Sequence, residues 1–179
     1  MSAAETWGTD AGERTLPFSC DHYLEKPDGA YFRGVTIRAS AHAIFRWLCQ
    51  MRVAPYSYDW IDNGGRRSPR TLTPGAEALA IGQTMMRSFS IVDFAPDRHV
   101  TLRIKHGSGG YRAFGDVAVT YLIVRLDADR CRLLVKIVVR YPSGLWGAFI
   151  RSALPWGDLV MMRRQLLNFK ALAERSSSP

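Results

Sequence analysis

The chain has 179 residues, a length that suits one domain with a single continuous core. Hydrophobic residues make up 47% of the sequence and charged residues 22%, which excludes a largely disordered chain. The net charge of +8 would suit an anionic partner, but the basic residues form no block and no zinc-finger, RNA-binding or basic-zipper motif is present, so we expect no nucleic-acid partner.

The sequence carries no sign of export, membrane insertion or a bound cofactor. Its three cysteines, Cys20, Cys49 and Cys131, fit neither a disulfide framework nor a metal site, which favours a reducing compartment. The N-terminal residues lack the apolar stretch of a signal peptide, and the longest apolar run, VAVTYLIV, is too short to span a bilayer. Neither a dinucleotide-binding glycine loop nor an H-E-x-x-H motif is present. We therefore expect a cytoplasmic protein without a metal, another cofactor or a transmembrane segment.

The first part of the chain predicts an arm, a strand and two helices. Residues 1–28 show little periodicity and end in the turn signal KPDG, so we predict an irregular arm. AYFRGVTIRAS alternates like a strand, although Arg33 shares the side of its apolar residues. Ser40 is suited to cap a helix that must end before Pro55. A second short helix follows Pro55 and is ended by the glycines of NGG.

The middle of the chain, about residues 79–141, is typical of β-structure. Four segments are rich in β-branched and aromatic residues: GQTMMRSFSIVDF, RHVTLRIK, DVAVTYLIVRL and RCRLLVKIVVRY. The turns between them are too short for parallel crossovers, so the pattern predicts one curved antiparallel sheet. The longest connection is the glycine-rich GSGGYRAFG, which we interpret either as a mobile gate or as an ordinary hairpin connection.

The last element is a long amphipathic helix. Pro155 stands just before its predicted start, and Asp158 suits its first turn. At about 100° per residue, one apolar face is formed by Leu159, Met162, Leu166, Phe169 and Ala173. This face needs a partner, and the concave side of the sheet is the available one. We predict a single domain over residues 29–175 and a disordered tail over 176–179.

Four stretches carry a resemblance to a known superfamily: TIRASAHAIFRWLCQMR, PYSYDWIDN, LAIGQTMM and PWGDLVMMRRQLLNFKALAE. Together with the element order they resemble the SRPBCC superfamily, the START-like and Bet v 1-like proteins that include polyketide cyclases. Within it, the chain is most similar to a bacterial branch often labelled only as polyketide-cyclase-like. The resemblance implies an α+β helix-grip fold, in which a curved antiparallel sheet wraps around a long C-terminal helix and two short helices follow the first strand.

The resemblance also implies a cavity between the sheet and the C-terminal helix. We expect it to bind a small hydrophobic or aromatic molecule, lipid-like or polyketide-like. One alternative is an enzyme of the cyclase, aromatase or dehydratase type, with acid-base residues at the cavity. A second alternative is a peripheral lipid carrier, for which the positive charge would give weak contact with anionic membranes. Fold alone does not choose among these functions, and the sequence predicts no oligomeric state.

Candidate ligand-binding residues come from three regions of the sequence. From the resemblance we expect four apolar or amphipathic side chains to point toward the cavity: Met85, Phe89, Tyr121 and Met162. The same residues would equally fill an ordinary core. Three aromatic residues follow the first helix, where they would line the mouth of the cavity or brace a helix corner: Tyr56, Tyr58 and Trp60. Tyr111, in the glycine-rich connection, completes the set.

Candidate acid-base residues are few. Asp59 and Asp62 would suit proton transfer if they were buried as a pair, but the arginines close to them in sequence favour ordinary salt bridges. His106, with Asp116 ten residues later, is the other candidate because histidine titrates near neutral pH. A solvated loop histidine is the alternative interpretation.

Overall fold

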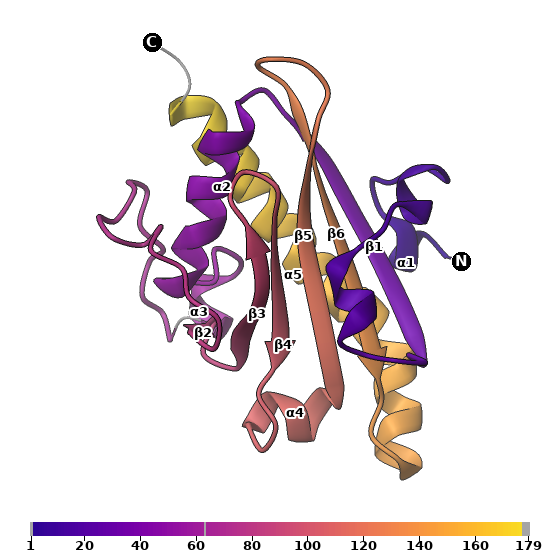
Figure 1. The fold of residues 1–179 in the computed structure, drawn as a ribbon. Helices are drawn as coiled ribbons and strands as arrows, with labels where there is room; N and C mark the ends of the chain where they lie inside the picture. Colours follow the sequence, from indigo (N-terminus) through magenta and orange to yellow (C-terminus); the bar gives the residue numbers. More distant parts are fainter. Residues whose placement is uncertain (1, 63, 177–179) are drawn as a thin grey trace.

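The computed structural model describes residues 2–62 and 64–176, without the side chains of residues 61 and 62. Of the predicted tail of residues 176–179, only Ser176 is described, as the last residue of a helix, and the NGG asparagine at position 63 also lies outside the described residues. Figure 1 shows a sheet with helices on one of its faces and an arm on the other. The helices are α1 (Ala3–Thr6), α2 (Ala41–Cys49), α3 (Asp59–Asp62), α4 (Gly109–Phe114) and α5 (Gly144–Ser176), with the 3₁₀ turns η1 (Glu13–Thr15), η2 (Ser19–His22) and η3 (Gln50–Arg52).

The sheet has six strands in the order β1-β6-β5-β4-β3-β2, and every neighbouring pair is antiparallel. The strands are β1 (Gly29–Ile37), β2 (Thr84–Met85), β3 (Phe89–Ala95), β4 (His99–Ile104), β5 (Asp116–Arg125) and β6 (Cys131–Arg140). Strands adjacent in sequence pair through short turns, whereas β1 returns to lie beside β6. The predicted antiparallel sheet is confirmed.

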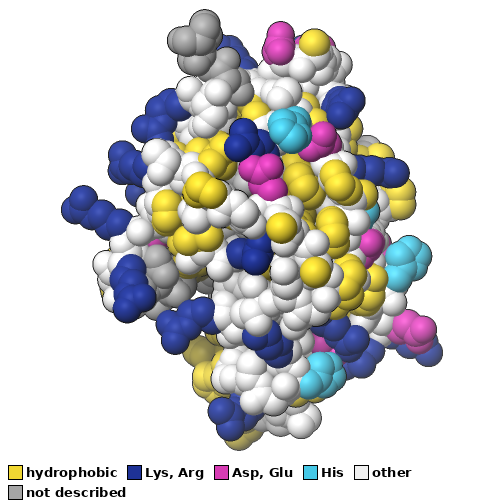
Figure 2. All heavy atoms as spheres, turned by 60° about the vertical axis from the view of Figure 1, so that its left-hand side comes forward, with side chains coloured by type: hydrophobic (Ala, Val, Ile, Leu, Met, Phe, Trp, Pro, Cys, Tyr) yellow, Lys and Arg dark blue, Asp and Glu magenta, His cyan; other side chains and the backbone are white. Residues whose placement is uncertain are grey.

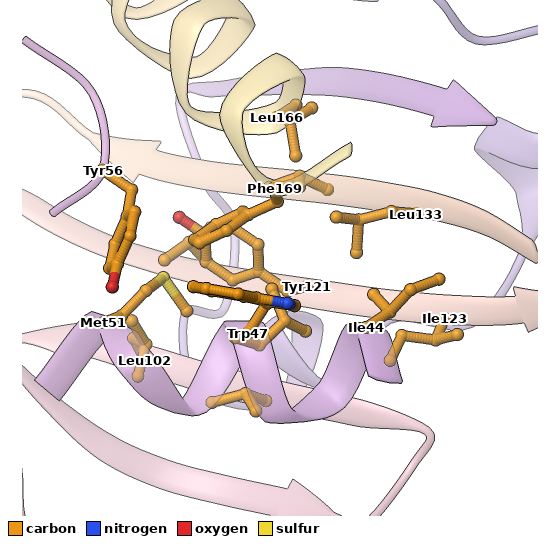
Figure 3. Packing of buried hydrophobic residues seen from close by; sticks show 14 of the residues in the cluster. Ile44, Trp47, Met51, Tyr56, Leu102, Tyr121, Ile123, Leu133, Leu166 and Phe169 are labelled. Carbon is orange, nitrogen blue, oxygen red and sulfur yellow. The ribbon is translucent and has the colours of Figure 1, made fainter. Parts of the chain in front are cut away.

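Helices α5 and α2 cover the inner face of the sheet, as Figure 1 shows. Helix α2 begins where the sequence predicted, because the Ser40 side chain accepts a hydrogen bond from the Ala43 amide at 3.2 Å. Its buried side packs with the sheet and with α5 in one hydrophobic core, of which Figure 3 shows Trp47, Tyr121 and Phe169 among others. This arrangement confirms the predicted helix-grip architecture.

The N-terminal arm covers the opposite, outer face of the sheet. Phe18, Cys20 and Leu24 are buried there against Phe32 of β1 and Leu134 of β6. The arm is also hydrogen-bonded to the sheet, since the Cys20 amide donates to the Thr120 hydroxyl at 2.8 Å and the Tyr23 hydroxyl donates to the Val92 carbonyl at 3.0 Å. Residues 16–24 thus bury the face of the sheet that α5 does not cover, whereas α1 and Trp7 lie against β1 and α5.

Two local predictions for the β region were wrong in detail. GQTMMRSFSIVDF forms two strands instead of one, because Met86 and Arg87 have positive φ values of 45° and 63° and turn the chain between β2 and β3. Part of the glycine-rich connection forms helix α4, which Ser108 caps by accepting a hydrogen bond from the Tyr111 amide at 3.1 Å.

The predicted start of the C-terminal helix was also wrong. Helix α5 begins at Gly144, and Pro155 lies inside it instead of ahead of it. Residues 144–154 are apolar on several sides, so no single periodic face marks them as a helix. The earlier start gives α5 an additional N-terminal half that extends past the ends of β5 and β6 in Figure 1.

Candidate ligand pocket

A pocket of about 570 Å³ lies between the segment of residues 56–70 and the C-terminal half of α5. This volume falls within the ~300–1,000 Å³ that is typical of small-molecule sites. We call it the 56–70 pocket. Its lining includes three aromatic and four basic side chains: Tyr56, Tyr58, Trp60, Arg67, Arg70, Arg164 and Arg175.

The 56–70 segment is fixed to α5 by side-chain amides. Gln165 donates from Nε2 to the Pro55 carbonyl at 2.6 Å, and Asn168 donates from Nδ2 to the Tyr56 carbonyl at 2.7 Å. Tyr56 has a positive φ of 59°, so the chain reverses direction at this point. Asp59 then closes the segment on itself, because its carboxylate accepts a hydrogen bond from the Ser68 amide at 2.8 Å. These hydrogen bonds hold the 56–70 segment in place as one wall of the pocket.

Tyr56 forms the floor of the pocket and belongs to the core at the same time. Its ring packs edge-on against Trp47, with centroids 6.1 Å apart, and lies 5.4 Å from the ring of Phe169. Figure 3 shows these rings side by side. The Tyr56 hydroxyl is buried without a hydrogen-bond partner among the described residues, and burial raises its pKa to about 12.

Tyr58 and Trp60 present aromatic surface to the pocket. The guanidinium carbon of Arg164 lies 6.0 Å from the centre of the Tyr58 ring, at the outer limit of a cation–π contact. Trp60 is 75% exposed, so its ring makes little contact with the rest of the described chain. Both rings are available to stack on a planar or apolar ligand.

The charge of the pocket is positive. Arg67, Arg70 and Arg175 are exposed, and none of them has a carboxylate partner among the side chains that the structure describes. The carboxylate of Asp59 also lines the pocket, but Ser68 holds it. Figure 2 brings forward the side of the molecule where α2 and α3 lie, and Lys and Arg side chains gather along its left-hand edge. Such guanidinium groups are suited to carboxylate, sulfonate or phosphate oxygens.

The other acid-base candidates lie beside α4, in a different part of the fold from Asp59 (Figure 1). His106 Nε2 is 3.8 Å from Asp116 Oδ2, and the His106 ring stacks on Tyr111 with centroids 4.6 Å apart. Asp116 is nearly buried and accepts two hydrogen bonds from Arg103, at 3.2 and 2.7 Å. The structure therefore brings His106, Tyr111 and Asp116 together, but not with Asp59. The Asp62 side chain lies outside the described part of the chain.

The residues expected to face an internal cavity lie in the core. Met85, Tyr121 and Met162 are buried between the sheet and α5, and Phe89 is half-buried against the same cluster. The Tyr121 hydroxyl donates to Gln165 Oε1 at 2.7 Å, which ties β5 to α5 through the core. These four residues are not among the side chains that line the 56–70 pocket.

A buried ion pair joins β1 to α5 near Pro155. Arg33 is fully buried and donates to Asp158 Oδ2 at 2.8 Å and to the Pro155 carbonyl at 3.3 Å. Burial raises the pKa of Asp158 to about 6, although Arg33 favours the carboxylate. Beside this pair, the Tyr31 and Tyr141 hydroxyls are hydrogen-bonded to each other. This cluster explains why Arg33 shares the apolar side of its strand.

A smaller pocket of about 370 Å³ lies between Arg52 and the loop of residues 73–76. Arg52 donates from Nη1 to three backbone carbonyls, those of Gly75, Ala76 and Ala78, at 3.0 to 3.1 Å. Because this guanidinium holds the loop in place, the smaller pocket is the weaker candidate for a ligand.

The sequence missed the contribution of α5 to the pocket. Arg164, Asn168, Ala171 and Arg175 follow one another at intervals of four, three and four residues, so they share a face of the helix. This spacing was visible in the sequence. What the sequence did not show is that the 56–70 segment lies against that face.

The described residues contain neither a cluster of metal ligands nor a helix that could span a membrane. No three His, Cys, Asp or Glu side chains of the described part come together in a way that could hold a metal ion. None of the described helices, α5 included, is both long and apolar enough to cross a bilayer.

Comparison with known proteins identifies the fold. No family model and no curated protein matches the sequence. Solved structures do match: a hypothetical protein of Helicobacter pylori has a TM-score of 0.57 at 13% identity, over 88% of this chain and 95% of that one. A protein of Mesorhizobium loti has a TM-score of 0.53 at 12% identity, over 84% and 100% of the two chains.

A third match is the di-domain ARO/CYC protein BexL from the BE-7585A biosynthetic pathway, with a TM-score of 0.50 at 13% identity. It covers 84% of this chain and 48% of BexL. At such identities the likeness concerns architecture and not activity. The matches therefore confirm the fold that the resemblance implied, a curved antiparallel sheet around a long C-terminal helix.

Proposed function

We propose that the chain binds a small molecule with an aromatic or other apolar body and an anionic group, and that it does so in the 56–70 pocket. The observation that carries this proposal is the combination, around one pocket of about 570 Å³, of exposed aromatic rings and arginines that have no carboxylate partner among the described side chains. The rings of Tyr58 and Trp60 would hold the body of the ligand by stacking. Arg67, Arg70 and Arg175 would pair with its anionic group.

The open pocket requires no rearrangement of the core. A ligand in the internal cavity expected from the sequence would have to separate Tyr121 from Gln165 and displace Met162. That would break a buried hydrogen bond and unpack close contacts. We therefore place the hydrophobic or aromatic ligand between the 56–70 segment and α5.

Binding is favoured over catalysis by the arrangement of the titratable groups. A cyclase or dehydratase needs an acid and a base within reach of one ligand. Asp59 lies at the pocket, whereas His106 and Asp116 lie beside α4 and Asp116 is engaged by Arg103. BexL shares the fold, but a fold does not determine a reaction. We also propose a reducing compartment such as the cytoplasm, since all three cysteines are buried free thiols.

Native mass spectrometry of the purified protein, followed by denaturing conditions, is the first test. A stoichiometric anionic compound with an apolar body, released only on unfolding, would support the proposal and name the ligand class. A neutral, purely apolar compound would contradict the role given to the arginines.

A matched pair of fluorescent probes tests the pocket directly. Anilinonaphthalene sulfonate carries an anionic group on an aromatic body, and N-phenyl-1-naphthylamine is its neutral counterpart. Replacing Arg67→Gln and Arg70→Gln together should weaken binding of the sulfonate by about tenfold, because two charge-assisted contacts are lost. Binding of the neutral probe should change little.

The control variant carries Arg125→Gln and Arg130→Gln, which remove the same charge from the exposed end of β5 and the turn after it. It should bind both probes as the wild type does. Equal loss of sulfonate binding in the two variants would show that net charge, and not the pocket, attracts the probe.

A further inference from the structure

The outer side of α5 carries an exposed apolar stripe. Leu145 is 92% exposed, and Phe149 and Trp156 are each 59% exposed. With Val160 and Leu167 they follow at intervals of four and seven residues, which places all five within about 60° around the helix at 100° per residue. We call these five residues the α5 stripe.

The α5 stripe is unusual because the opposite side of the same helix is already buried. Met162, Leu166 and Phe169 belong to the core between α5 and the sheet, and Ile150 is buried in the N-terminal half, so α5 is apolar on both sides. The N-terminal half extends past the ends of β5 and β6 in Figure 1, where no described segment covers its outer side. A contiguous exposed stripe with two large aromatic residues marks a surface for another partner.

Helix α4 widens this apolar surface. The Trp146 indole donates from Nε1 to the Ala113 carbonyl at 2.9 Å, and its ring lies 5.5 Å from that of Phe149. Phe114, at the end of α4, is 41% exposed. The Trp146 ring is therefore held in place beside Phe149 of the stripe.

The charges near the stripe favour an anionic partner. Arg163 and Arg164 are exposed between Val160 and Leu167 of the stripe, whereas Arg151 lies on the other side of the helix, 3.8 Å from Asp28 Oδ1. The one carboxylate along the length of the stripe, Asp158, turns inward to Arg33. A second copy of the chain would bring arginines against arginines without carboxylates to meet them, so self-association through this face is disfavoured.

We propose that the α5 stripe docks on the surface of an anionic lipid bilayer. Trp and Phe side chains partition to the boundary between headgroups and acyl chains, and arginines beside them pair with lipid phosphates. The helix lies on the membrane and does not cross it, in agreement with the absence of a membrane-spanning helix from the described part. None of the five stripe residues lines the 56–70 pocket, although Arg164 borders both surfaces.

Vesicle flotation tests the proposal. The full chain should bind vesicles of phosphatidylcholine with added phosphatidylserine at low salt, bind more weakly at high salt, and bind poorly to phosphatidylcholine alone. The variant with Phe149→Ser and Trp156→Ser should bind the anionic vesicles at least about tenfold more weakly, since two inserted aromatic residues are lost.

A matched control replaces two equally exposed apolar residues far from the stripe. Ile81→Ser and Leu126→Ser alter side chains that are 63% and 49% exposed, and the variant should bind vesicles like the wild type. Thermal melts of both variants establish that they are folded. Failure of the wild type to float with anionic vesicles at low salt would overturn the proposal, as would equal binding by the two variants.

Analytical ultracentrifugation without lipid tests the alternative that the α5 stripe binds a second copy of the chain instead of a membrane. The wild type should sediment as a monomer. A dimer that Phe149→Ser and Trp156→Ser abolish would assign the stripe to a second copy of the chain and overturn the membrane proposal.

Discussion

Tyr56 and Tyr121 are equally buried but differ in the partner of their hydroxyl. The Tyr121 hydroxyl donates to Gln165 Oε1, whereas the Tyr56 hydroxyl has no partner among the described residues. Tyr121→Phe should lower the free energy of unfolding by about 1–3 kcal/mol, because it leaves the buried Gln165 oxygen unsatisfied. Tyr56→Phe should change it by no more than about 0.5 kcal/mol, or raise it, because no bond is lost.

Urea denaturation of the two variants side by side measures this difference. The substitutions remove the same atom from the same residue type, so each variant is the control for the other. A loss for Tyr56→Phe as large as that for Tyr121→Phe would mean that the Tyr56 hydroxyl is hydrogen-bonded, for example through a buried water.

Arg33 and Asp158 make the stability of the protein depend on pH. Burial raises the pKa of Asp158 to about 6, so the folded state holds a proton that the unfolded state, with an aspartate pKa of about 3.9, releases. Stability should therefore fall as the pH rises from about 4 to about 6. In Arg33→Met the opposing cation is gone, the pKa of Asp158 rises further, and the decline should continue above pH 6.

Urea midpoints measured from pH 4 to pH 8 test this prediction. Adding Asp158→Asn to Arg33→Met removes the titrating group, so the double variant should lose the extended decline and be the more stable of the two at pH 8. The same slope above pH 6 in the wild type and in Arg33→Met would contradict the linkage. No sequence pattern links Arg33 to Asp158, since 125 residues separate them, and only the tertiary structure explains an arginine on the apolar side of β1.

Among the helices and strands, the sequence predicted correctly the ones whose position is set by local signals such as alternation, caps and prolines. Alternation and β-branched residues located the strands, and the Ser40 cap with Pro55 bounded α2 and the turn after it. It failed where tertiary contacts override local signals. The turn between β2 and β3 places Met86 and Arg87 at positive φ, which their residue types do not indicate.

The two ends of α5 show the same contrast. The C-terminal half has a clear periodic face, and it was predicted. The N-terminal half is apolar inside and outside, so periodicity was absent and Pro155 was interpreted as a helix start. For the pocket, the sequence indicated the aromatic residues of the 56–70 segment but not the helical arginines, because their meeting depends on the docking of that segment on α5.

The N-terminal arm is an element whose contribution can be measured with matched phenylalanines. Phe18 is buried between the arm and the outer face of the sheet, whereas Phe149 is exposed on α5. Phe18→Ala should lower the free energy of unfolding by about 3 kcal/mol or more, as for other buried phenylalanines. Phe149→Ala should change it by less than about 0.5 kcal/mol.

Thermal or urea unfolding of the two variants provides the measurement. A small effect of Phe18→Ala would mean that the arm separates from the sheet at little cost, and that the outer face of β1, β5 and β6 tolerates exposure. A large effect would establish the arm as part of the folding unit.

In the whole molecule, the arrangement of arm, sheet and helices leaves two surfaces exposed on α5, one lined by arginines and one apolar. The arm covers the outer face of the sheet, and α2 and α5 cover the inner face, so the side of α5 that faces away from the sheet is the principal apolar surface left open. Its C-terminal half joins the arginine-lined 56–70 pocket, and its N-terminal half carries most of the α5 stripe. One helix thus serves two proposed sites.

Hydrogen exchange can separate these two sites in one molecule, because binding slows exchange where it suppresses local opening. Anilinonaphthalene sulfonate should protect residues 56–70 and 164–175 and leave residues 145–160 unchanged. Anionic vesicles should protect residues 145–160 and leave the 56–70 segment unchanged. If both agents protected the same half of α5, the helix would have a single binding surface, and one of the two proposals would be wrong. If each protected its own half, a ligand could occupy the pocket while the protein lies on a membrane.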